Sequence, residues 1–185
     1  VLKLANIDEI DDDEILTIDS VSKRLLCYKL TRQISDPVAT KNQKDVTWPI
    51  LFYPLASGEG SFKRDLVIGD FDGNGLTDIA ISDPTAAEII LYKQIPGLGL
   101  TQPARFPAFA DIESLSVGDI EGDGKDEIAV LSVKEKVIGI SRFEDERLSF
   151  PQPIELIDEP LAMELADIDT DDSMDCIYIC KDANN

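Results

Sequence analysis

An acidic phrase of nine residues occurs three times in this 185-residue chain, each time behind a short apolar run. The copies begin at Asp70, Asp119 and Asp167 and are therefore 49 and 48 residues apart. Oxygen-bearing side chains stand at positions 1, 3, 5 and 9 of each copy. A fixed period of this size is typical of proteins built from repeated supersecondary units. We therefore expect an array of repeats.

Each phrase lies between two segments with the alternating, β-branched pattern of strands. The segments before the phrases are 66–69, 115–118 and 163–166, and those after them are 79–82, 128–131 and 176–179. A turn, a third strand and a proline-led fourth strand follow in two units, the fourth at 101–106 and 151–156. Proline suits an edge strand, where a missing N–H donor costs least. Four strands per repeat predict an all-β fold of β-propeller blades, each a four-stranded antiparallel sheet.

The N-terminus carries a degenerate copy of the phrase that begins at Asn6 and has Ile10 at position 5. The next copy starts 64 residues later, and the excess falls between residues 35 and 62. The predicted blades are 1–62, 63–111 and 112–160, with the start of another at 161–185. This amounts to about three and a half blades, whereas propellers close with about four to eight. Because an open ring leaves unpaired edges, we expect remaining blades or another protein to complete it.

The oxygen spacing predicts loops that bind Ca²⁺, which prefers six to eight oxygen ligands. An EF-hand is excluded because position 12 is Ile81, Val130 or Tyr178 within a strand instead of a bidentate Glu. The predicted ligands are Asp70, Asp72, Asn74, Asp78 and the Leu76 carbonyl; Asp119, Glu121, Asp123, Glu127 and the Lys125 carbonyl; and Asp167, Asp169, Asp171, Asp175 and the Ser173 carbonyl.

Glycine at position 6 permits the tight reversal of two of these loops, at Gly75 and Gly124; the third loop has Asp172 there. For any single loop the alternative is an Asx-rich turn that binds only its own backbone. Repetition in register favours the cation for the three regular loops. For the degenerate loop, an uncharged turn held by Asn6 and Asp8 is the preferred interpretation.

The phrase D-x-D-x-[DN]-G-x-x-[DE] at 70–78 and 119–127, led by Gly69 and Gly118, resembles the VCBS-type repeat of the FG-GAP superfamily. Related calcium-loop blades occur in integrin α-subunit propellers, although the Phe-Gly and Gly-Ala-Pro words that name the superfamily are absent from this chain. The resemblance implies a propeller with structural Ca²⁺ between the first two strands of each blade. It does not fix an activity, because function depends on the site and not on the fold.

Composition narrows the possible partners. A formal net charge of −20 argues against nucleic acid or an anionic membrane surface. No apolar run is long enough for a transmembrane segment, and the chain has no histidine to act as general base or zinc ligand.

Cys176 and Cys180 share one face of a predicted strand about 13 Å apart, too far for a disulfide. We expect these two and Cys27 to be small buried apolar residues.

The favoured function is a non-catalytic, calcium-stabilised module for binding or scaffolding in an exported protein. Extracellular Ca²⁺ modules have dissociation constants of about 10⁻⁴–10⁻³ M, which suits an extracellular, cell-surface or periplasmic location. The alternatives are the propeller portion of a secreted polysaccharide-degrading enzyme, a lectin, or a Ca²⁺ switch. No catalytic residue is predicted, because no acid pair outside the loops stands out.

Three aromatic residues distinguish the 35–62 stretch: Trp48, Phe52 and Tyr53. They could form a platform for a glycan or protein ligand, since exposed aromatic rings often anchor partners. The alternative, which we favour, is that these rings fill a gap in the core or cover the edge of a blade.

Overall fold

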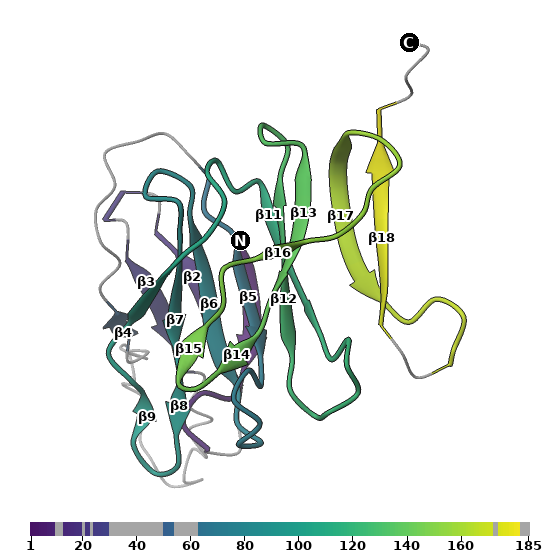
Figure 1. Cartoon of the computed structure of the whole chain (residues 1–185). Coiled ribbons are helices and arrows are strands. Elements are labelled where there is room, and N and C mark those ends of the chain that lie inside the picture. Colours follow the sequence, from purple (N-terminus) through teal and green to yellow (C-terminus); the bar gives the residue numbers. More distant parts are fainter. Residues whose placement is uncertain are drawn as a thin grey trace, which may run out of the picture.

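The computed structural model describes residues 1–9, 13–19, 21–22, 24–29, 50–53, 63–171 and 174–181, with the side chains of Ile50 and Phe52 left out. The described residues form β-strands and no helix (Figure 1), which confirms the predicted all-β class. Accordingly, the described part of the chain contains no helix that could span a membrane.

Three four-stranded antiparallel sheets follow one another along the chain. The first contains β1 (Leu2–Ala5), β2 (Glu14–Ile18), β3 (Leu25–Tyr28) and β4 (Ile50–Tyr53). The second contains β5 (Leu66–Gly69), β6 (Asp78–Asp83), β7 (Glu88–Tyr92) and β10 (Ala104–Pro107). The third contains β11 (Ser114–Gly118), β12 (Glu127–Ser132), β13 (Val137–Ser141) and β16 (Gln152–Pro153). In each sheet the strands pair in chain order, as in a propeller blade.

Three two-stranded ribbons complete the described fold. Two are hairpins between the third and fourth strands of the second and third sheets: β8 (Gln94–Ile95) with β9 (Gly99–Leu100), and β14 (Phe143–Glu144) with β15 (Arg147–Leu148). The third ribbon pairs β17 (Pro160–Ala166) with β18 (Asp175–Cys180), which correspond to the first two strands of a further sheet.

The two hairpins were not predicted from the sequence, and the fourth strands of the sheets differ from the prediction: β10 begins at Ala104 instead of residue 101. The fourth strand of the first sheet, β4, lies within the stretch that the repeat alignment treats as excess, and it pairs with β3. The fourth strand of the third sheet, β16, is only Gln152–Pro153, shorter than the predicted 151–156. Its shortness follows from Pro151 and Pro153, which have no backbone N–H for the ladder.

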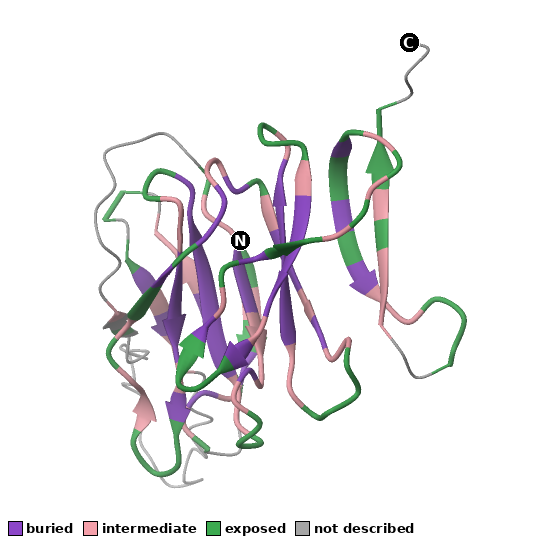
Figure 2. Ribbon diagram, viewed as in Figure 1, coloured by how far each residue is buried: buried purple, intermediate pink, exposed green. Residues whose placement is uncertain are grey.

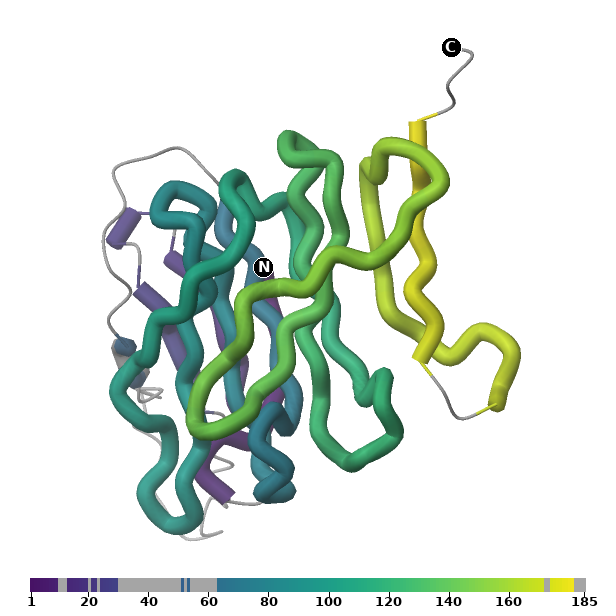
Figure 3. The backbone as a smooth tube through the Cα atoms, viewed as in Figure 1, coloured from purple at the N-terminus to yellow at the C-terminus, as the bar shows by residue number. Residues whose placement is uncertain are grey.

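The sheets stand side by side along the chain (Figures 1 and 3). The first strand of each sheet contacts the first strand of the next, so that β1 lies beside β5, β5 beside β11, and β11 beside β17. Blades of a propeller are arranged in this way around a common axis. The described residues form an arc of such blades.

The core consists of three apolar clusters, each between two successive sheets, and Figure 2 shows the buried strands that form them. In β12, Ile128 and Val130 pack toward the second sheet, whereas Ala129 and Leu131 pack toward β17. Successive side chains point to opposite faces of a strand. A strand buried on both faces therefore needs a continuous apolar run, which the sequence of β12 supplies.

The apolar residue at position 2 of each loop extends this packing. Ile7 is buried in the first cluster, between the first and second sheets, and Phe71 in the second cluster, between the second and third sheets. Ile120 packs against the third cluster, between the third sheet and β17. Ile168, at the same position of the last loop, is 66% exposed. Position 2 thus anchors the first three loops to the interface between their own sheet and the next one.

Candidate metal centre

The loop 70–78 connects β5 to β6, and Gly69 pairs with Asp78 at its base. Asp70, Asp72 and Asp78 each offer a carboxylate oxygen, and these oxygens lie within 4.8 Å of one another. Asp78 is fully buried, and the other two are partly exposed. Three convergent carboxylate oxygens on a strand–loop–strand unit are a ligand set for a hard cation such as Ca²⁺.

Backbone amides hold these carboxylates in place. Asp70 accepts hydrogen bonds from the N–H groups of Asn74 (3.0 Å) and Gly75 (2.7 Å) through its two oxygens. Asp78 accepts one from the Phe71 N–H (3.2 Å) and one from the Gln94 N–H (2.7 Å). The loop is therefore preorganised by its own backbone and by the first residue of β8.

The electrostatics of the cluster favour a cation. Burial raises the pKa of Asp78 to about 7, and the nearby carboxylates of Asp72 and Asp70 act in the same direction. The two backbone hydrogen bonds oppose this shift without cancelling it. A divalent ion among the three carboxylates would offset both the burial and the mutual repulsion, and would keep Asp78 ionised.

The loop 167–175 connects β17 to β18 and repeats the arrangement. Asp167, Asp169 and Asp175 offer oxygens within 4.8 Å of one another. Asp167 accepts the N–H of Thr170 (2.7 Å), and Asp175 accepts the N–H of Ile168 (3.3 Å). The predicted carbonyl ligand Ser173 and the neighbouring Asp172 lie outside the described residues.

The loop 119–127 has the same backbone but a different arrangement of acids. Asp119 accepts the N–H groups of Asp123 (3.1 Å) and Gly124 (2.9 Å), as Asp70 does at the equivalent positions. Glu127 accepts the Ile120 N–H (2.8 Å), and burial raises its pKa. The groups of three acids within 4.8 Å in the described part of the chain are those at 70–78 and 167–175, so no three acids of 119–127 converge in this way.

In the degenerate loop, Asn6 accepts hydrogen bonds from the backbone of Asp8 (3.3 Å) and Glu9 (2.8 Å). Glu14 accepts the N–H of Ile7 (3.0 Å), as the position-9 acid does in the other loops. The Asp8 carboxylate forms an ion pair with Lys29. These contacts fit the turn predicted here, and Ile10 lies outside the described residues.

Sequence reasoning missed the conformation of position 4, which is left-handed in all four loops. The residues are Glu9 (φ 62°), Gly73 (φ 73°), Gly122 (φ 68°) and Thr170 (φ 63°). Glycine adopts this region without steric cost. Gly73 and Gly122, which recur at position 4 of the loops 70–78 and 119–127, were the sequence signal that could have predicted this left-handed conformation.

The glycines directly before the loops 70–78 and 119–127, Gly69 and Gly118, are required for a different reason, which is the space available to their side chains. A Cβ atom on Gly69 would lie 2.7 Å from an Oδ atom of Asp126, and one on Gly118 would lie 2.9 Å from Cγ of Met174. Asp126 and Met174 both occupy position 8 of the next loop. Asp126 also accepts the Asp70 N–H (2.8 Å) and donates its own N–H to the Asp70 carbonyl (2.9 Å). The motif glycine thus permits close contact with the following blade.

Of the three aromatic residues considered as a ligand platform, the structure places the side chain of one. Tyr53 packs against the first core cluster, and its ring meets that of Tyr92 edge to face at a centroid distance of 5.8 Å. This position matches the packing alternative for Tyr53. Trp48 and the side chain of Phe52 lie outside the described residues.

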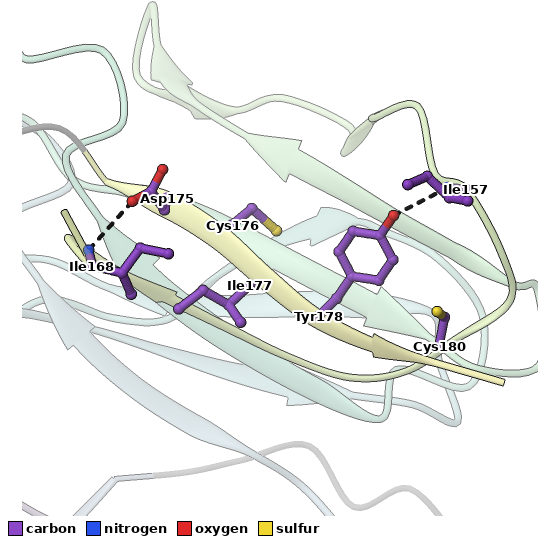
Figure 4. Close-up of a pocket in the computed structure, with 7 residues that line it drawn as sticks. All are labelled: Ile157, Ile168, Asp175, Cys176, Ile177, Tyr178 and Cys180. Atoms are coloured by element: carbon purple, nitrogen blue, oxygen red, sulfur yellow. Dashed lines mark hydrogen bonds between the residues drawn. The ribbon is translucent and has the colours of Figure 1, made fainter. Parts of the chain in front are cut away.

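The outer face and edge of β18 lack the cover that earlier sheets have. Ile177 and Ile179 are 38% and 64% exposed, whereas Ala129 and Leu131 at the same places in β12 are fully buried. Figure 4 shows Ile177 with Asp175, Cys176, Tyr178 and Cys180 of β18 around a hollow that also includes Ile157 and Ile168. Cys180, expected to be buried, is exposed at the end of β18, Cys176 is partly buried, and Cys27 is buried as predicted.

Comparison with known proteins agrees with this architecture. Residues 70–130 match the family model of the FG-GAP-like repeat, which confirms the resemblance to that superfamily. The chain is also similar to a chain in a structure of the Tc holotoxin pore of Photorhabdus luminescens, with a TM-score of 0.51 and 14% identity over 90% of this chain and 8% of that one. At this identity the likeness bears on the fold alone. No curated protein matches this chain in sequence.

The class of protein follows from these observations. Successive four-stranded sheets, with loops between their first and second strands, define a β-propeller module. More particularly, this chain is a propeller module that carries an FG-GAP-like repeat at 70–130.

Proposed function

We propose that this module is a non-catalytic binding or scaffolding unit of an exported protein, and that structural Ca²⁺ stabilises it. The observation that carries the proposal is the convergence of Asp70, Asp72 and Asp78 at the base of β6. The repetition of that convergence at 167–175 supports it. A bound ion would link the end of one strand to the start of the next and turn carboxylate repulsion into attraction.

A structural role for the ion follows from the position of the loops. In each of the three regular loops the position-9 acid on the second strand accepts the N–H of the position-2 residue, and in the loop 70–78 the position-2 side chain, Phe71, is also buried. A Ca²⁺ switch needs an element with two stable arrangements. A loop closed by paired strands at both ends offers little scope for such a change, so stabilisation is the favoured role.

A non-catalytic role is proposed because the described acids outside the loops include several that neighbouring basic residues neutralise. Asp83 is buried and pairs with Arg64 at 2.8 Å. Glu88 pairs with Arg105 at 2.9 Å. Glycoside hydrolysis uses two carboxyl groups that flank the scissile bond, and carboxylates committed to ion pairs with arginine are poor candidates for that role.

Equilibrium dialysis with radioactive calcium tests the metal proposal. We expect two ions per chain, with dissociation constants of about 10⁻⁴–10⁻³ M if the module works outside the cell. Asp70→Asn and Asp167→Asn should each remove one ion, while Asp158→Asn, outside the loops, should leave both. A chain that binds no Ca²⁺ at 10 mM, about ten times the weaker constant, would contradict the proposal.

The uncovered face of β18 supports the proposal that further blades or a partner protein complete the ring. The occupant should supply a strand that pairs with β18 and is apolar along most of its length, as β7 and β13 are beside β6 and β12. Such a strand would cover the free edge of β18 at Cys180, and a further blade beyond it would cover Ile177 and Ile179, as β17 covers Ala129 and Leu131.

Thiol labelling tests ring completion. In the chain described here, Cys180 should react with iodoacetamide at pH 8, and it should become protected in the assembly that completes the sheet. Cys27 is the internal control, since burial, together with the Glu14 carboxylate, raises the pKa of its thiol to about 12, so it should stay unreactive in both. Equal labelling of Cys180 in both forms would refute the proposed cover.

A further inference from the structure

A basic residue follows directly after the third strand of each four-stranded sheet. Each of these residues contacts the acid at position 3 of the loop in its own sheet. The pairs are Lys29 with Asp8, Lys93 with Asp72, and Arg142 with Glu121. Three successive repeats therefore place a fixed positive charge beside the same loop position.

The contact differs between the two regular loops that have it. Lys93 Nζ lies 3.1 Å from Asp72 but 2.7 Å from Glu146 in the next sheet, and it also lies 4.9 Å from the centre of the Phe143 ring. Its charge is therefore divided between two blades. Asp72 keeps an oxygen within 4.8 Å of the oxygens of Asp70 and Asp78, so this loop retains its convergent ligand set.

Arg142 holds its partner more closely. Its Nε donates to Glu121 Oε1 at 2.6 Å, and the Arg142 side chain is 30% exposed. A guanidinium carries a permanent charge and forms directional hydrogen bonds with carboxylates. Glu121 is one methylene longer than Asp72, which lets its carboxylate extend toward Arg142. The acids of 119–127 do not converge, although this loop has four carboxylates at positions 1, 3, 5 and 9, whereas 70–78 has three and an amide.

We propose that Arg142 is an internal cation that takes the place of the metal ion at 119–127. A loop that has carboxylates at all four motif positions is then held together by the protein itself, and the ions bind at 70–78 and 167–175. This inference rests on the proposed calcium function and assigns its selectivity among the three loops to a residue outside the motif.

The test compares Ca²⁺ stoichiometry in the wild type and in Arg142→Gln by equilibrium dialysis. Removing the guanidinium frees Glu121, so the variant should bind one ion more than the wild type, three instead of two. Arg147→Gln is the matched control: Arg147 is an exposed residue of β15 in the same sheet region, and its loss changes the net charge equally. That variant should bind as many ions as the wild type.

A second variant, Arg142→Met, keeps the aliphatic stem that packs on the surface and guards against a folding defect in the first. If the Arg142 variant that remains folded binds no more Ca²⁺ ions than the wild type, the inference is overturned. It is also overturned if Arg147→Gln gains as many ions as the Arg142 variants. The outcome is separate from that of the calcium proposal. If the wild type binds no Ca²⁺, the calcium proposal fails, while a gain of one ion in Arg142→Gln would still support the inference and no gain would overturn it.

Discussion

Phe71→Ala should lower the free energy of unfolding by about 3–5 kcal/mol, the usual range for truncating a buried phenylalanine. Phe71 is fully buried in the cluster between the second and third sheets, together with Leu115, Ile128 and Phe143. Its loss would leave a cavity at the interface of two blades and loosen the loop that presents Asp70 and Asp72. Urea unfolding followed by circular dichroism measures the effect.

Ile168→Ala is the matched control, because Ile168 occupies the same loop position but is 66% exposed. Its truncation should change the free energy of unfolding by less than about 0.5 kcal/mol, as is usual for surface substitutions. In an assembly with a further blade the same substitution should become costly. Similar effects of the two substitutions in this chain would show that position 2 does not anchor loops to the next blade.

The repeat made most of the fold predictable. The apolar runs at 79–82 and 128–131 became β6 and β12, which are buried along their whole length. The acidic phrase gave the positions of the loops, because a hard cation and a tight strand-to-strand turn both require oxygen side chains at these spacings. These strands and loops could be predicted because each is determined by residues that are neighbours in the sequence.

The structure departs from the sequence-based predictions where contacts between residues far apart in the chain determine the conformation. Arg142 is 21 residues from Glu121 in sequence, and nothing in the motif indicates that it approaches that side chain. Gly69 is required by Asp126, which belongs to the next blade. The strand β4 was hidden because its spacing from β3 differs from that in the other repeats. Each of these features depends on three-dimensional packing that a single sequence does not display.

Calcium should raise the melting temperature of this chain by roughly 10–20 °C relative to EDTA. An ion present at 100 times its dissociation constant stabilises the folded state by about 2.7 kcal/mol per site. For a chain of this size, 1 kcal/mol corresponds to about 2–4 °C. Two occupied sites therefore give the expected shift, which differential scanning calorimetry measures.

The selectivity of the effect distinguishes coordination from screening. Magnesium at the same concentration should give a much smaller shift, since Mg²⁺ demands near-octahedral geometry and dehydrates reluctantly. A variant with Asp70→Asn and Asp167→Asn together should lose the calcium response while remaining folded in EDTA. If calcium and magnesium shift the melting temperature equally, or if the double variant still responds, the ions act only by screening the net charge of −20. The convergent carboxylates would then be acidic turns held by their own backbone, and the blades would be joined by apolar packing alone.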